Sequence, residues 1–129
     1  MTLVDTSVWI ITFRAHQPLD LETVVPLDEV VTCLPVIQEV LQGFRNETAY
    51  RNATTMMFSL PVVESPLEEQ VFRQAVDLFR TARRVGLTIR SSVDCLVAAC
   101  ALRHDLTILH ADRDYTALAR VSQLRERRI

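Results

Sequence analysis

The stretch Thr2–Trp9, which reads TLVDTSVW, sets the organisation of this chain. A short apolar run ends at Asp5, which is followed by the hydroxyl side chains of Thr6 and Ser7 and then by apolar residues at helical spacing. This pattern predicts a buried strand that leads directly into a helix. Parallel α/β sheets bind ligands beyond the carboxyl ends of their strands, so Asp5 lies where it could contact a ligand or take part in catalysis. Asp5 is equally typical of a helix cap that accepts backbone N–H groups.

Length and composition indicate an ordinary globular protein. With 129 residues, 49% hydrophobic and 23% charged, we expect a single domain spanning residues 1–129. No apolar run approaches the roughly 20 residues that a membrane span needs, and no basic leader precedes the first strand. We therefore expect a cytoplasmic protein with no membrane association.

The cysteines give no sign of a disulfide or zinc site. Cys33, Cys95 and Cys100 lie in apolar segments without CxxC spacing, and the three histidines share no ligand spacing with them. Buried, reduced thiols are the expected state.

Charge is distributed unevenly along the chain. Residues 1–65 hold three arginines and eight acids, whereas residues 66–129 hold eleven arginines and eight acids. Every basic side chain apart from histidine is arginine, whose guanidinium suits phosphate groups. The second half is therefore the expected source of phosphate contacts.

Strand and helix patterns alternate along the whole chain. Strands are predicted near residues 3–4, 30–34, 61–63 and 106–109, with helices over 35–44, 46–60, 66–84, 91–102 and about 113–121. Residues 18–26 are expected to form a short helix or turn, and the charged tail 125–128 a solvated end. This order predicts a three-layer α/β/α sandwich with a mostly parallel central sheet.

One predicted helix carries its own start and stop signals. Ser65 is expected to cap it, Pro66 to occupy its first position and Gly86 to end it.

Three further acids stand at strand-to-helix passages. Glu39 lies one turn into its helix, Asp112 follows a strand, and Asp94 interrupts a helix that is apolar on nearly every side. A solvated Glu39 and a helix-capping Asp94, with Ser91 as N-cap, are the simpler interpretations. Against capping, a carboxylate on a buried helix needs a cation, a metal or several donors.

If Asp5, Glu39, Asp94 and Asp112 converge at the carboxyl edge of the sheet, they form a cluster of like charges that requires a cation. Hard oxygen ligands suit Mg²⁺ or Mn²⁺, and a metal-bound water is a nucleophile that attacks phosphorus. The pattern thus favours metal-dependent phosphodiester hydrolysis.

Several other phosphate-handling classes are excluded. With only two glycines there is no GxGxxG motif and no P-loop. A phosphorelay receiver needs a lysine, which the chain lacks, and a haloacid-dehalogenase-like phosphatase needs an acid at position 7, which is Ser7.

The order of these motifs resembles the PIN-domain ribonucleases, and within them the VapC toxins of toxin–antitoxin operons. The resemblance rests on Asp5-Thr6-Ser7, on Glu39 in LPVIQEVLQG, on IRSSVDCLVAACAL around Asp94 and on HADRDY around Asp112. It spans residue 3 to about 120, although residues 46–86 contain no motif that we can match.

The resemblance implies roles for these residues. Asp5, Glu39, Asp94 and Asp112 carry over as the catalytic acids, with Asp5, Asp94 and Asp112 as metal ligands and Asp5 and Asp94 the principal ones. Glu39 and Asp112 would complete the pocket and orient water. As auxiliary residues, Asp114 would add an acid and Thr6 or Ser7 would support Asp5.

The resemblance also implies an RNA substrate, a VapB-like antitoxin that lays a peptide across the active cleft, and a homodimer. Two alternatives remain open from the residues alone. One is a PIN-like binding module that no longer cuts, and the other is a DNA or nucleotide phosphohydrolase built on the same acids.

Overall fold

The computed structural model describes all residues from Met1 to Ile129 and shows a five-stranded, entirely parallel sheet in the order β3-β2-β1-β4-β5. The strands are β1 (Thr2–Val4), β2 (Val30–Cys33), β3 (Val62–Val63), β4 (Thr107–His110) and β5 (Arg125–Arg128). The predicted α/β/α architecture with a parallel sheet is confirmed.

Six helices flank this sheet. They are α1 (Thr6–Phe13), α2 (Leu34–Gln42), α3 (Glu47–Ser59), α4 (Glu69–Arg84), α5 (Ser92–Arg103) and α6 (Arg113–Ala119). Two single 3₁₀ turns, Leu21–Thr23 and Leu27–Glu29, follow α1, and the first of them agrees with the short helix or turn predicted over residues 18–26.

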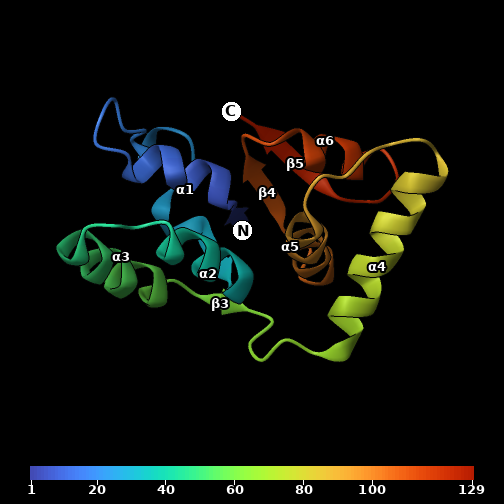
Figure 1. Ribbon diagram of the computed structural model, residues 1–129, viewed down its shortest axis with the longest axis horizontal. Helices are drawn as coiled ribbons and strands as arrows, with labels where there is room; N and C mark the ends of the chain where they lie inside the picture. Colours follow the sequence, from blue (N-terminus) through green and yellow to red (C-terminus); the bar gives the residue numbers. More distant parts are fainter.

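The direction of the chain across the sheet explains the two outer layers. The chain moves outward from β1 through β2 to β3, then crosses to β4 and β5 on the other side of β1. Right-handed crossovers place α1–α3 on one face and α4–α6 on the other. The contacts agree, because α2 packs on α1 and α3 whereas α5 packs on α4 and α6, and the two groups separate in Figure 1.

The core is a single cluster of 32 buried apolar residues. The central strands β1 and β4 and the helix α5 contribute fully buried side chains such as Leu3, Ile108 and Ala98. The three cysteines are free and buried, as predicted. No helix has the length and apolarity needed to cross a membrane.

One local prediction is wrong, and one strand was not predicted. Residues 125–128 form the edge strand β5, parallel to β4 from Thr107↔Arg125 to His110↔Arg128, while three of its four side chains are exposed, as expected of a solvated end. Ser65 and Pro66 do not start a helix, since α4 begins at Glu69. Glu64 adopts a φ of 53°, and its side chain accepts a hydrogen bond from Arg103 on α5. The chain therefore turns at Glu64, before α4 starts.

The carboxyl ends of β1 and β4 define the topological switch point. These two strands are neighbours, and the connections that leave them run in opposite directions across the sheet. Ligands of parallel α/β sheets bind in the crevice at such a point. Asp5 directly follows β1, and Asp112 follows β4 after one residue.

Candidate active site

Asp5 is fixed by hydrogen bonds to both of its carboxylate oxygens. Oδ2 accepts the Ser7 backbone N–H at 2.9 Å and the Ser7 hydroxyl at 2.6 Å, so Asp5 does cap α1. Oδ1 accepts the hydroxyl hydrogen of Tyr115 at 2.6 Å. Asp5 therefore caps α1 with one oxygen, while its other oxygen shares the Tyr115 hydroxyl with Asp94, and its role in the site stays a prediction.

Asp94 is a buried carboxylate and does not cap its helix. No side chain caps the start of α5, where the Asp94 backbone N–H bonds to the Ser91 carbonyl. Asp94 is 5% exposed, its Oδ1 lies 3.3 Å from the Tyr115 hydroxyl, and its Oδ2 has no hydrogen-bond partner. Burial, and then the neighbouring acids, raise the pKa of this carboxyl to about 9. An uncompensated buried carboxylate of this kind calls for a cation.

Asp112 and Asp114 flank the start of α6. Asp112 Oδ1 accepts the Asp114 backbone N–H at 2.9 Å and so caps the helix. Asp114 is buried, and its Oδ2 accepts the backbone N–H groups of Arg90 and Ser91, both at 3.1 Å. Its Oδ1 is buried without a hydrogen-bond partner.

Asp94, Asp112 and Asp114 form one cluster. Each offers a carboxylate oxygen, and these three oxygens lie within 4.8 Å of one another. Two of the acids carry the unpartnered buried oxygens described above. Hard oxygen donors at this spacing fit a divalent cation such as Mg²⁺ or Mn²⁺, which would satisfy both orphaned atoms.

The cluster differs in membership from the predicted metal ligands. Asp94 and Asp112 are in it, and Asp114, predicted as an auxiliary acid, is in it as well. Asp5 lies outside this group and reaches Asp94 only through the Tyr115 hydroxyl. The direct role of Asp5 in holding a metal stays a prediction.

Glu39 faces the same site from α2. Its Oε1 accepts the Thr6 hydroxyl at 2.9 Å, so Thr6 supports Glu39, and of the two hydroxyls predicted to support Asp5 only that of Ser7 does so. Partial burial raises the pKa of Glu39, the Thr6 hydrogen bond lowers it, and the charges of Asp5 and Asp112 raise it further. Glu39 is therefore not the freely solvated helix acid of the simpler interpretation.

Two residues of the site were not predicted. Tyr115 is fully buried and its hydroxyl bridges Asp5 and Asp94. His110 is also fully buried, its Nδ1 accepts the Asp112 backbone N–H at 3.1 Å, and its Nε2 bonds to Glu126 on β5. Because Nδ1 accepts, Nε2 carries the hydrogen and donates it to Glu126. The only signal in the sequence was a polar aromatic residue and a histidine next to acids at a strand end.

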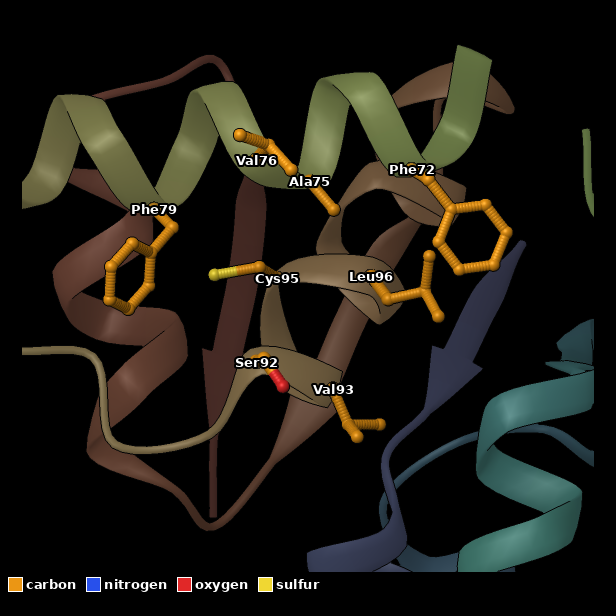
Figure 2. A pocket seen from close by; sticks show the side chains of 8 residues that line it. All are labelled: Phe72, Ala75, Val76, Phe79, Ser92, Val93, Cys95 and Leu96. Carbon is orange, nitrogen blue, oxygen red and sulfur yellow. The ribbon is translucent and has the colours of Figure 1, made fainter. Parts of the chain in front are cut away.

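An apolar groove runs beside the acid cluster. Phe72 and Phe79 project from α4 toward α5, which carries Val93 and Leu96 (Figure 2). Together with Val76 these residues line a hollow of about 390 Å³. A second hollow of about 340 Å³ shares Phe72, Val93 and Leu96 and continues to Glu39. The two hollows thus share one wall, and the second reaches Glu39.

Comparison with known proteins gives the family. The PIN domain family profile matches residues 2–121. Ribonuclease VapC11 of Mycobacterium tuberculosis is 34% identical over 130 residues, which cover 96% of each chain. The relatives thus share nearly the full length of this chain.

Solved structures share the fold. One is VapBC-5 from M. tuberculosis, described as a member of the VapBC family of toxin–antitoxin systems, with a TM-score of 0.74, 22% identity and coverage of 99% and 98% of the two chains. Another is VapC20 of M. tuberculosis, described as a sarcin-ricin loop cleaving toxin, with a TM-score of 0.71, 20% identity and coverage of 97% and 99%. With the acid site at the switch point and the sequence match to VapC ribonucleases, this chain belongs to the PIN-domain family and to its VapC branch.

Proposed function

We propose that this chain is a divalent-metal-dependent endoribonuclease that serves as the toxin of a toxin–antitoxin pair. The observation that carries the proposal is the cluster of Asp94, Asp112 and Asp114, in which two buried carboxylate oxygens have no hydrogen-bond partner. Kinship with VapC ribonucleases supports the same reaction. The alternative of a binding module without activity is not favoured, because all the predicted acids are present and three of them, Asp94, Asp112 and Asp114, lie close together.

The bound ion would be held by Asp94, Asp112 and Asp114, with Asp5 as the predicted further ligand. Oxygen-only donors favour Mg²⁺, with Mn²⁺ as the second candidate. When bound, such an ion supplies a water of lowered pKa as nucleophile and stabilises charge on the phosphate. We include Asp5, Glu39, Asp94 and Asp112 among the catalytic acids.

The chain's own groups prepare this site before substrate binds. The Tyr115 hydroxyl lies between Asp5 and Asp94 and connects their carboxyl groups. Glu39, which is half-buried and hydrogen-bonded to Thr6, is placed to accept a proton from the attacking water. His110 holds the Asp112 backbone at the start of α6.

The partners follow from the relatives and from the surface. The VapBC-5 structure supports a VapB-like antitoxin as partner. We assign the groove of Phe72, Val76, Phe79, Val93 and Leu96 to an apolar segment of that antitoxin, because it runs to Glu39 and an occupant would block the site. We further propose that residues 1–129 act as one domain and that the chain forms a homodimer. Its proposed location is the cytoplasm, where RNA is available.

Matched RNA and DNA substrates test the reaction type. We expect the purified chain to cut RNA and to leave DNA of the same sequence intact with Mg²⁺, and to cut neither with EDTA. Cleavage of the DNA at an equal rate would favour a general phosphohydrolase. Sedimentation of the chain alone tests the homodimer, which a monomer at micromolar concentration would contradict.

A further inference from the structure

Arg90 lies at the mouth of the acid cluster, immediately before the Ser91 N-cap of α5. Its backbone is anchored by the site itself, since Asp114 Oδ2 accepts the N–H groups of Arg90 and Ser91 at 3.1 Å each. The start of α5, the helix that carries Asp94, is thereby tied to α6. The backbone of Arg90 is therefore held in place by the site.

The guanidinium group of Arg90 points back at two of the clustered carboxylates. Nη2 lies 3.6 Å from Asp112 Oδ1, and Nε lies 3.9 Å from Asp114 Oδ1. These are ion-pair distances but too long for hydrogen bonds, and the Arg90 side chain is 55% exposed. The group is attracted to the cluster by charge without being locked into it.

A divalent ion bound by Asp112 and Asp114 competes with the guanidinium for the same negative charge. Like-charge repulsion from such an ion favours a guanidinium turned away from the carboxylates toward solvent, to which the Arg90 side chain is already 55% exposed. A guanidinium is a planar fork of donors that binds a phosphate through two hydrogen bonds.

We propose that Arg90 is an exchangeable counter-ion, paired with Asp112 and Asp114 in the metal-free chain and with a phosphate of the RNA in the metal-loaded chain. The substrate half of this inference rests on the proposed ribonuclease function. The metal half depends only on the geometry of the cluster.

Two variants and one matched control test this exchange of Arg90 between the carboxylates and a phosphate. Arg90→Gln removes the charge but keeps the backbone N–H groups that Asp114 accepts, and Arg90→Lys keeps the charge without the fork. Arg51→Gln is the control, because Arg51 is an exposed arginine on α3 that pairs with Glu47 at a similar distance of 3.7 Å.

The first measurement is a calorimetric titration of each protein with Mn²⁺ in the absence of RNA. Removal of the competing cation in Arg90→Gln is expected to tighten Mn²⁺ binding about threefold, whereas Arg51→Gln binds like the native chain. Unchanged affinity in Arg90→Gln would overturn the exchange.

The second measurement is RNA cleavage with Mg²⁺ at several NaCl concentrations. Arg90→Gln is expected to raise KM about tenfold with a smaller effect on kcat, and to reduce the slope of log(kcat/KM) against log[NaCl] by about 0.7, the value for one phosphate of a single strand. Arg90→Lys is expected to fall between the native chain and Arg90→Gln.

The outcomes separate this inference from the proposed function. If the native chain cuts RNA but Arg90→Gln matches Arg51→Gln in KM and salt slope, Arg90 does not bind substrate and the inference fails alone. If the native chain cuts no RNA, the proposed function fails, and so does the proposed contact of Arg90 with an RNA phosphate. The Mn²⁺ titration still tests whether Arg90 competes with the metal ion.

Discussion

Tyr115 donates its hydroxyl hydrogen to Asp5 Oδ1 over 2.6 Å, and the same hydroxyl oxygen lies 3.3 Å from Asp94 Oδ1. One buried hydroxyl thus connects the acid at the end of β1 with the acid on α5. Burial and the charges of Asp5 and Asp94 raise the pKa of Tyr115, so the hydroxyl keeps its hydrogen. The geometry of the site depends on this bridge.

Tyr115→Phe is expected to destabilise the fold and to weaken the site. Loss of the donor leaves a buried Asp5 oxygen without its partner, which costs about 1–3 kcal/mol in the free energy of unfolding. RNA cleavage should fall at least about tenfold, since one tenfold step corresponds to about 1.4 kcal/mol in transition-state free energy. Denaturant unfolding and initial cleavage rates measure both effects.

Tyr50→Phe is the control for that variant, because Tyr50 is the other tyrosine and lies exposed on α3. It should match the native chain in both assays. Equal behaviour of Tyr115→Phe and Tyr50→Phe would show that the bridge contributes nothing.

Asp94→Asn is expected to stabilise the metal-free chain and to abolish its response to metal. With a pKa of about 9 in the folded chain, Asp94 must take up a proton when the metal-free chain folds at pH 7, a cost that Asn does not carry, so the melting temperature in EDTA should rise. Mg²⁺ at ten times its Kd should stabilise the native chain by about 1.4 kcal/mol, by mass action, and Asp94→Asn much less. Thermal unfolding with Mg²⁺ and with EDTA tests this, and equal Mg²⁺ stabilisation of both proteins would contradict it.

Most of the fold follows from patterns in the sequence. β1 and β4 are apolar runs that each end near an acid, and the fold needs only right-handed crossovers to bring Asp5 and Asp112 together. The strand β5 was missed because its residues 125–128, RERR, have no apolar alternation. Its pairing with β4 and the bond from Glu126 to His110 are tertiary contacts that no local pattern contains.

The site was predictable in its residues but not in its connections. Burial of Asp94 follows from the apolar helix around it, whereas Asp5 and Asp112 turned out to cap helices and face the site at once. The closeness of Asp114 to Asp94 depends on how α6 packs on α5. The Tyr115 bridge depends on the same packing, so no local pattern of residues could predict it.

Glu64→Gln is expected to destabilise the chain in a pH-dependent way. Glu64 is 7% exposed at its side chain, and its Oε1 bonds to Arg103 Nε at 2.6 Å and to His104 Nε2 at 3.0 Å. The Arg103 hydrogen bond is the main reason why the pKa of Glu64 lies below its usual value of 4.5. At pH 7 the substitution should cost about 1–3 kcal/mol in unfolding free energy.

The sign of the pH effect follows from that lowered pKa. The stabilisation is fully present above pH 4.5 and is lost as the pH falls through the lower pKa of the folded state. The native and Glu64→Gln unfolding free energies should therefore converge between pH 4.5 and more acidic values. Glu47→Gln, which breaks an exposed ion pair with Arg51, serves as control. A difference that does not change with pH would refute the assignment.

Val76→Glu is expected to block the antitoxin but not the nuclease. Val76 is 55% exposed on the rim of the apolar groove in Figure 2. A carboxylate at this position stays solvated in the free chain, but it loses its water when an apolar segment of the antitoxin covers it. Binding of the cognate antitoxin should weaken about tenfold or more, with kcat and KM for RNA unchanged. Val85→Glu, at an exposed valine outside the groove, is the control. Equal antitoxin affinity of the two variants would exclude this groove as the contact.

Cleavage of a labelled cellular RNA pool tests the central claim most directly. The purified chain is assayed with Mg²⁺, with EDTA, as Asp94→Asn, and as Asp77→Asn, which changes an exposed acid on α4 in the same chemical way. We predict discrete cuts that require Mg²⁺, persist in Asp77→Asn and fall about a thousandfold in Asp94→Asn, a loss of about 4 kcal/mol in transition-state stabilisation. Cleavage by Asp94→Asn at the native rate, or cleavage that survives EDTA, would contradict a metal-dependent nuclease at this cluster.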